Sequence, residues 1–98
     1  MAQVVLSARA FEDIERLREF LLQTAPEVAE SLMASVFDAL AVLDAHPRIG
    51  RRKSGELREL VIGQGRTGYL ALYVYDEIRE IVRVLRLRHQ RDAGYKDC

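Results

Sequence analysis

The chain has 98 residues, 49% of them hydrophobic and 31% charged, and this size and composition predict one folded domain over residues 1–98. No membrane segment is expected, because the longest stretch without a charged residue, Thr67 to Tyr75, is far shorter than the about 20 residues of a spanning helix. The N-terminus lacks the features of a signal peptide, and the only cysteine, Cys98, has no second cysteine to pair with. We therefore expect a cytoplasmic protein.

The net charge is zero, but the charges are unevenly divided along the chain. Residues 1–47 hold three Arg against eight Asp and Glu, and residues 48–98 hold twelve Lys and Arg against seven Asp and Glu. The two halves therefore carry charges of −5 and +5. A basic half is either solvated surface or the binding surface for an anionic partner.

The first residues predict a strand that leads into a helix. Residues 3–7 (QVVLS) form a short run rich in β-branched side chains, and Ser7 is placed to cap a helix over about residues 8–23. The apolar residues that recur at helical spacing in this segment are Phe11, Ile14, Leu17 and Leu21.

A second helix is expected to follow at once. Residues 24–27 (TAPE) fit a capping box, with Thr24 as the N-cap and Glu27 three residues later. His46-Pro47 ends this helix, because a residue before proline avoids the helical conformation. The short connection predicts an antiparallel helical hairpin. The apolar positions of the second helix are Ala29, Leu32, Met33, Val36, Leu40 and Leu43.

After Pro47 the pattern becomes alternating, as in strands. Three runs, ELRELVIG (56–63), GYLALYVYD (68–76) and REIVRVLRLRH (79–89), are separated by a Gly-rich connection and a tight turn. In the middle run one face bears Leu70, Leu72 and Val74 and the other bears tyrosines, so one face reads as core and the other as semi-polar. The predicted fold class is α+β: an N-terminal strand, a helical hairpin and a three-stranded antiparallel meander that completes one sheet packed on the helices.

Several apparent motifs carry no function in this context. Residues 63–68 match G-x-G-x-x-G, but the dinucleotide fingerprint must open a helix, and a strand follows here. Two histidines and one cysteine without ligand spacing predict no metal site, and no serine lies in a nucleophile elbow. We expect no cofactor.

Two basic segments remain as candidate binding surfaces, because guanidinium groups suit phosphates and carboxylates equally well. The first is the predicted loop that contains Arg48, Arg51, Arg52 and Lys53, and the second is the last strand with Arg83, Arg86, Arg88 and Arg91. On an ideal strand Leu85, Leu87 and His89 share one face, and Arg86 and Arg88 share the other. His89 is then either a histidine that ends a core row or a functional group.

The segments HPRIGR, LRELVIGQGRTGYLALYVYD and VLRLRHQRDAGY, in this order after a helical hairpin, resemble the RelE/ParE toxins of bacterial type II toxin–antitoxin modules. The resemblance covers essentially the whole chain. It implies the compact α+β fold, a ParD-like antitoxin encoded beside the toxin, contact with DNA only through that antitoxin, and a role in plasmid or module maintenance through growth arrest.

The resemblance leaves two activities open. A RelE-like toxin cleaves messenger RNA in the ribosome, which needs proton transfer and cations around the phosphate. For that activity the candidate residues are His89, Tyr95, Arg58, Arg86 and Arg88. Against it, the lysine-rich central strands of many RelE-like nucleases are missing, since only Lys53 and Lys96 occur and neither lies in a predicted strand.

The block LREL…GYLALY looks closer to the ParE-like toxins, which inhibit DNA gyrase and are not known as nucleases. We therefore favour gyrase inhibition. A third hypothesis is a protein-interaction module that keeps the toxin fold without toxicity, because fold does not fix function. The candidate target-binding residues are Arg51, Arg52, Arg86, Arg88, His89, Arg91 and Tyr95.

Overall fold

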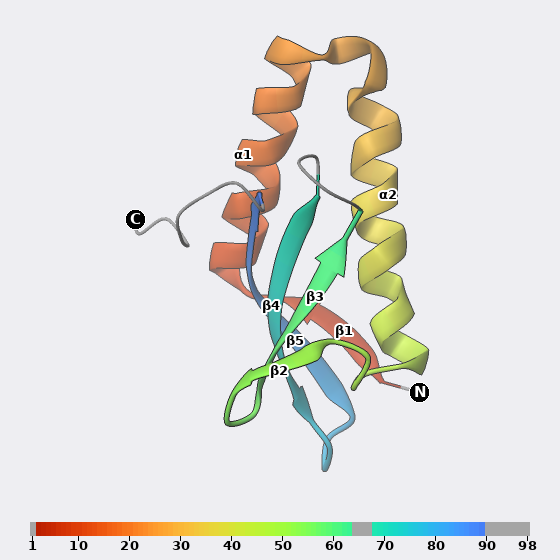
Figure 1. Cartoon of the computed structure of the whole chain (residues 1–98), viewed down its shortest axis with the longest axis vertical. Helices are drawn as coiled ribbons and strands as arrows, with labels where there is room; N and C mark the ends of the chain where they lie inside the picture. The colour runs from red at the N-terminus through yellow and green to blue at the C-terminus, as the bar shows by residue number, and fades with distance from the viewer. Residues whose placement is uncertain (1, 64–67, 90–98) are drawn as a thin grey trace.

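A computed structural model describes residues 2–63 and 68–89, which fold into two helices and one sheet (Figure 1). In chain order the elements are β1 (Gln3–Leu6), α1 (Ala8–Thr24), α2 (Pro26–Ala45), β2 (Arg51–Ser54), β3 (Leu57–Ile62), β4 (Tyr69–Asp76) and β5 (Ile81–His89). The strand order is β1-β5-β4-β3-β2, with β1 parallel to β5 and the other pairs antiparallel. The α+β fold predicted from the sequence is confirmed.

The prediction missed one strand, β2. The segment Arg51–Ser54 was expected to be a loop, but it pairs with β3 at the edge of the sheet, after a turn at Gly55. All four of its side chains are exposed, so it has no apolar alternation to mark it in the sequence. As a consequence Lys53 does lie in a strand, contrary to expectation.

The helical hairpin forms as predicted, except at its connection. Ser7 caps α1, accepting a hydrogen bond from the amide of Ala10 at 3.0 Å. Thr24 is not the N-cap of α2: it ends α1, and its hydroxyl donates to the carbonyl of Phe20 at 2.8 Å. Once bonded one turn back along its own helix, this hydroxyl does not cap the next one. Ala25 alone separates the helices, and Pro26 starts α2.

The core lies between the helical hairpin and one face of the sheet. The predicted stripe of α2 is buried at Ala29, Met33, Val36, Leu40 and Leu43. On α1 Ile14 and Leu21 are buried, but Phe11 is 56% exposed and the neighbouring Ala10 is buried in its place. The sheet contributes Ile62, Tyr69, Ala71, Tyr73, Val82, Val84 and Leu87. The tyrosine face of β4 is therefore the core face.

A bulge in β5 changes its predicted alternation. Val84 pairs with Tyr73 and Arg86 pairs with Leu72, so Leu85 is the extra residue between two regular registers. Beyond the bulge, Leu87 is buried against the helices and Arg86 lies on the opposite side. No helix among the described residues is long and apolar enough to cross a membrane.

Candidate functional site

Arg86, predicted to bind a target, is held by a buried carboxylate of α1. Its Nε donates to Oδ2 of Asp13 at 2.9 Å and its Nη2 donates to Oδ1 at 3.2 Å. The backbone N–H of Leu87 donates to the same carboxylate at 2.8 Å, and Arg16 donates to it at 3.1 Å. Only 3% of the Asp13 side chain and 12% of the Arg86 side chain are exposed. The pair therefore links α1 to the C-terminal half of β5, which extends past the residues that pair with β1.

The two residues that follow on β5 lie on opposite faces of the sheet. Arg88 pairs with Leu70, on the face away from the helices, and donates from Nη1 to the carbonyl of His89 at 3.3 Å. His89 pairs with Tyr69 on the core face, and the two rings meet edge-to-face with centroids 5.2 Å apart. This contact matches the interpretation of His89 as the end of a core row. The predicted residues Arg91 and Tyr95 lie outside the described residues.

On β2 the basic residues split between the faces of the strand. Glu59 of β3, whose side chain is 3% exposed, accepts from Arg51 at 3.1 Å and lies 3.7 Å from the Nζ of Lys53. Arg52 is exposed and pairs with Arg58 of β3 on the other face. The sequence alone gives no sign of this division, because a short exposed strand shows no periodicity.

Arg58 fixes the loop that follows α2. Its Nη1 donates to the carbonyls of Arg48 at 3.1 Å and of Gly50 at 2.8 Å. The amide of Gly50 donates to the hydroxyl of Tyr73 at 2.8 Å, so the loop is bound to the centre of the sheet as well. Burial raises the pKa of Tyr73, while the Gly50 hydrogen bond and the charge of Arg58 oppose that shift.

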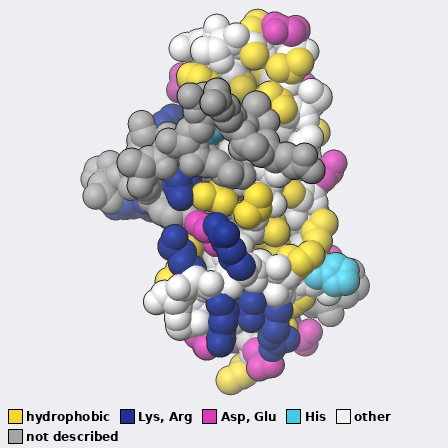
Figure 2. Space-filling view, in the orientation of Figure 1, with side chains coloured by type: hydrophobic (Ala, Val, Ile, Leu, Met, Phe, Trp, Pro, Cys, Tyr) yellow, Lys and Arg dark blue, Asp and Glu magenta, His cyan; other side chains and the backbone are white. Residues whose placement is uncertain are grey.

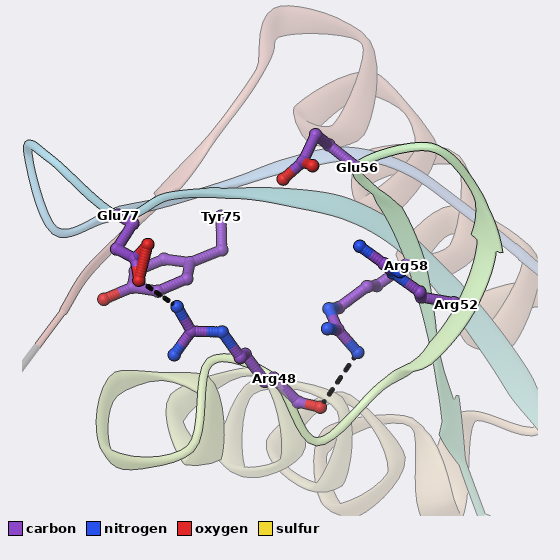
Figure 3. Close-up of a pocket in the computed structure, with 6 residues that line it drawn as sticks. All are labelled: Arg48, Arg52, Glu56, Arg58, Tyr75 and Glu77. Carbon is purple, nitrogen blue, oxygen red and sulfur yellow. Dashed lines mark hydrogen bonds and ion pairs between the residues drawn. The ribbon is translucent and has the colours of Figure 1, made fainter.

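These contacts shape a polar cavity of about 230 Å³ at the end of the sheet that projects beyond the helices (Figure 3). It is lined by Arg48, Arg52, Glu56, Arg58, Tyr75 and Glu77. Arg48 forms an ion pair with Glu77, and its guanidinium carbon lies 5.1 Å from the centroid of the Tyr75 ring. The sequence had grouped Arg48 with Arg52 in one basic loop and had suggested Arg58 only for the nuclease, but it had not placed Arg58, Tyr75 or the two acids beside that loop.

The sheet face away from the helices has an apolar and acidic centre. By register it carries Leu57, Glu59, Val61, Leu70, Leu72 and Val74 on β3 and β4. Figure 2 shows hydrophobic and acidic side chains in the middle of the molecule and Lys and Arg gathered toward the β2–β3 hairpin. Among the described residues, the cations of this face come from the flanking strands β2 and β5.

The structure does not bring the described nuclease candidates together. Arg58 pairs with Tyr73 and His89 pairs with Tyr69, so they stand four residues of β4 apart, about 13 Å along the strand. Arg86 and Arg88 pair with residues of the opposite face. In residues 2–63 and 68–89 there is also no group of three His, Cys, Asp or Glu side chains arranged to hold a metal ion.

Comparison with known proteins identifies the family. The profile of the ParE toxin of the type II toxin–antitoxin system parDE matches residues 4–94. The chain belongs to this ParE toxin family. It is a toxin of a type II toxin–antitoxin module within the RelE/ParE superfamily.

The relatives of this ParE-family chain carry both superfamily names. "Toxin RelE3" of Caulobacter vibrioides is 37% identical over 91% of this chain and 95% of its own length. The chromosomal ParDE system from P. aeruginosa gives a TM-score of 0.74 at 16% identity, over 91% of this chain and 96% of that one. The intact RelBE complex of E. coli gives 0.62 at 16% identity, over 94% of this chain and 100% of that one. At these identities the solved structures establish the fold.

Proposed function

We propose that this ParE-family toxin arrests growth by inhibiting DNA gyrase, in the cytoplasm, and that a ParD-like antitoxin neutralises it. The observation that carries the proposal is the separation of the candidate nuclease groups. Cleavage of RNA through its 2′-hydroxyl needs a proton-transfer group and cations around one phosphate. Here Arg58 and His89 are far apart on the core face, and Asp13 engages Arg86.

The centre of the open sheet face supports the same proposal. A phosphate approaching this face would meet Glu59, Val61 and Leu72 on the two central strands. The carboxylate of Glu59 is already bound by Arg51 and Lys53, and the apolar side chains beside it offer a phosphate no hydrogen bond. A protein target with apolar groups suits the centre of this surface better than an RNA backbone does.

A ribosome-dependent messenger endonuclease is the second candidate function. It is favoured by one observation, the name of the Caulobacter relative, "Toxin RelE3", with 37% identity. Under this alternative the proton-transfer groups would be His89 and Tyr95, with Arg58, Arg86 and Arg88 at the phosphate.

The antitoxin part of the proposal is supported by the helical hairpin. Large apolar side chains are exposed along α1 and α2: Phe11, Phe20, Leu22, Val28, Phe37 and Val42. Exposed apolar side chains of this size give an amphipathic helix of the antitoxin anchors to pack against. An acidic antitoxin tail would complement the +5 charge of residues 48–98, so salt should slow association more than it speeds dissociation.

Two assays on the purified full chain separate the functions: supercoiling by DNA gyrase, and cleavage of messenger RNA on translating ribosomes. We expect inhibition of supercoiling and, in cells, arrest with induction of DNA-damage signals. Rapid loss of messenger with unimpaired supercoiling would refute the gyrase proposal in favour of the nuclease. Normal growth after expression would support the non-toxic interaction module.

A His89→Gln variant sharpens the comparison, because glutamine keeps hydrogen-bonding ability but does not act as a general acid or base near neutral pH. Gyrase inhibition should survive this change. A messenger nuclease that uses His89 should lose roughly 10²–10⁴-fold in rate. The change removes the edge-to-face ring contact with Tyr69, so an unchanged melting temperature is the control that the fold is retained.

A further inference from the structure

The cavity beside β2 gathers three guanidinium groups from three separate segments of the chain. Arg48 comes from the loop after α2, Arg52 from β2 and Arg58 from β3. Figure 3 shows the Arg48 guanidinium beside Glu77 and Tyr75 on one side of the cavity and Arg52 and Arg58 on the other, with Glu56 at its rim. Three arginines within one polar cavity repel one another unless an anion lies between them.

The three arginines differ in how firmly they are held. Two backbone carbonyls fix Arg58, at 2.8 and 3.1 Å. Arg48 is paired with Glu77, but both side chains are more than half exposed, and such an ion pair is weak. Within the described part of the chain, the side chain of Arg52 makes no hydrogen bond or ion pair. The cavity therefore combines a preorganised cation, an exchangeable ion pair and an uncommitted cation.

We propose that this cavity binds the carboxylate side chain of an acidic, extended segment of a partner protein. Three Arg against two Glu leave one positive charge, which matches a single carboxylate. Glu77 already shows that a carboxylate fits against Arg48, and the incoming group can displace it or lie between Arg52 and Arg58. A guanidinium group binds a carboxylate through two parallel hydrogen bonds.

The position of the cavity favours a peptide as its source. β2 is the last strand of the sheet, so the outer backbone groups of Arg51–Ser54 can pair with an added strand. The side chain of Arg52 lies on the cavity side of that edge, because it pairs with Arg58. A segment added along β2 would place alternate side chains beside the arginines. The basic edge repels a second copy of β2 and attracts an acidic strand.

A nucleic acid fits the surroundings less well. The neighbouring cations are already engaged in ion pairs within the protein: Arg51 and Lys53 share Glu59, and Arg79 is paired with Asp76. A phosphate backbone needs a continuous row of uncommitted cations, whereas this surface offers one site. The assignment is independent of whether the toxin acts on gyrase or on the ribosome.

Titration of the purified full chain with two matched peptides, followed by NMR, tests the assignment without the antitoxin or the target. The probes are acetyl-Gly-Glu-Gly-amide and acetyl-Gly-Gln-Gly-amide, with inorganic phosphate and a six-nucleotide single-stranded RNA as further ligands. We expect saturable shifts of the amides of Arg52, Arg58 and Tyr75 with the glutamate peptide and none with the glutamine peptide.

Three variants test which side chains of the cavity bind the carboxylate and which compete with it. Arg52→Ala should weaken binding of the glutamate peptide about tenfold or more, the effect of one lost hydrogen bond to a charged group. Glu77→Gln should tighten it about twofold to fivefold, because a competing exposed carboxylate is removed. Arg79→Ala, which removes an exposed arginine paired with Asp76 outside the cavity, should leave the affinity unchanged.

Equal shifts with the glutamine peptide, or tighter binding of phosphate or RNA than of the glutamate peptide, would overturn the assignment to a protein carboxylate. An equal loss in the Arg52 and Arg79 variants would reduce it to general charge attraction. Weaker binding in Glu77→Gln would show that Glu77 builds the site instead of competing for it.

Discussion

Replacement of Arg86 by methionine tests whether this residue recognises a target or holds the fold. The change removes the guanidinium and leaves the carboxylate of Asp13 with the amide of Leu87 and with Arg16, whose side chain is 48% exposed. Breaking a buried ion pair costs about 3–5 kcal/mol of the free energy of unfolding. Because Asp13 keeps these two partners, we expect a loss at the lower end, about 3 kcal/mol. For a domain of this size, that loss lowers the melting temperature by roughly 12–24 °C.

The matched control is the double variant Asp13→Asn/Arg86→Met. The amide oxygen of asparagine still accepts from the N–H of Leu87, and no buried charge is left without a partner, since Arg16, which loses its ion pair, is 48% exposed. We expect this variant to lie within about 1 kcal/mol of the native protein and to be more stable than either single variant. Urea unfolding followed by circular dichroism gives the three free energies, and growth arrest is measured on the same variants.

The reasoning fails if Arg86→Met unfolds within about 1 kcal/mol of the native chain, or if the double variant is no more stable than the single ones. A stable double variant that has lost toxicity would indicate that Arg86 takes part in target binding. A stable double variant that still arrests growth would leave it with a structural role alone.

Three further predictions concern other parts of the molecule. Gly50→Ala should destabilise the fold by about 3 kcal/mol in urea unfolding, since the added Cβ would lie 2.6 Å from the Tyr73 ring and hydroxyl. Gly55→Ala should cost about 1 kcal/mol in the same assay, because Gly55 has a φ of 56° but open space around it. Burial raises the pKa of Tyr69 and Tyr73 above 10.0, so the folded state holds these protons more tightly than the unfolded state does. The stability from this difference is fully present below pH 10 and should fall as the pH rises further. Urea unfolding midpoints measured against pH test this, and a flat profile would contradict it. Phe20→Ser, at a side chain that is 59% exposed, should change stability by less than about 0.5 kcal/mol while weakening antitoxin binding in calorimetry by about tenfold, and unchanged affinity would exclude Phe20 as an anchor.

The secondary structure was largely predictable because long amphipathic elements repeat their signal. The stripe of α2 extends from Ala29 to Leu43, and each buried position reinforces the same helical period. β2 has four exposed side chains and no such repetition, so only its pairing with β3 defines it. Phe11 continued the α1 stripe in the sequence, but Ala10 occupies the contact with the core. Short elements and single positions depend on tertiary packing that local periodicity does not contain.

The candidate site was less predictable, because its contacts join distant residues. The hydrogen bonds between Arg86 and Asp13 span 73 residues, and the bulge at Leu85 shows in the sequence only as two adjacent apolar residues, Val84 and Leu85, within the alternating run. The cavity depends in the same way on the loop after α2 meeting β3, through carbonyl groups that any sequence would supply. Sequence spacing identified the basic residues, but it did not show which of them form hydrogen bonds or ion pairs inside the fold.

The division of charge along the chain therefore overstates the surface available for recognition. Asp13 belongs to the acidic half and Arg86 to the basic half, so part of the opposite charge is neutralised inside the fold. Arg52 stands at the other extreme, exposed and with no ion pair among the described residues. A variant of Arg86 that loses toxicity is informative about a target only after its stability has been restored. A variant of Arg52 is informative directly, because removing its charge leaves no buried carboxylate without a partner.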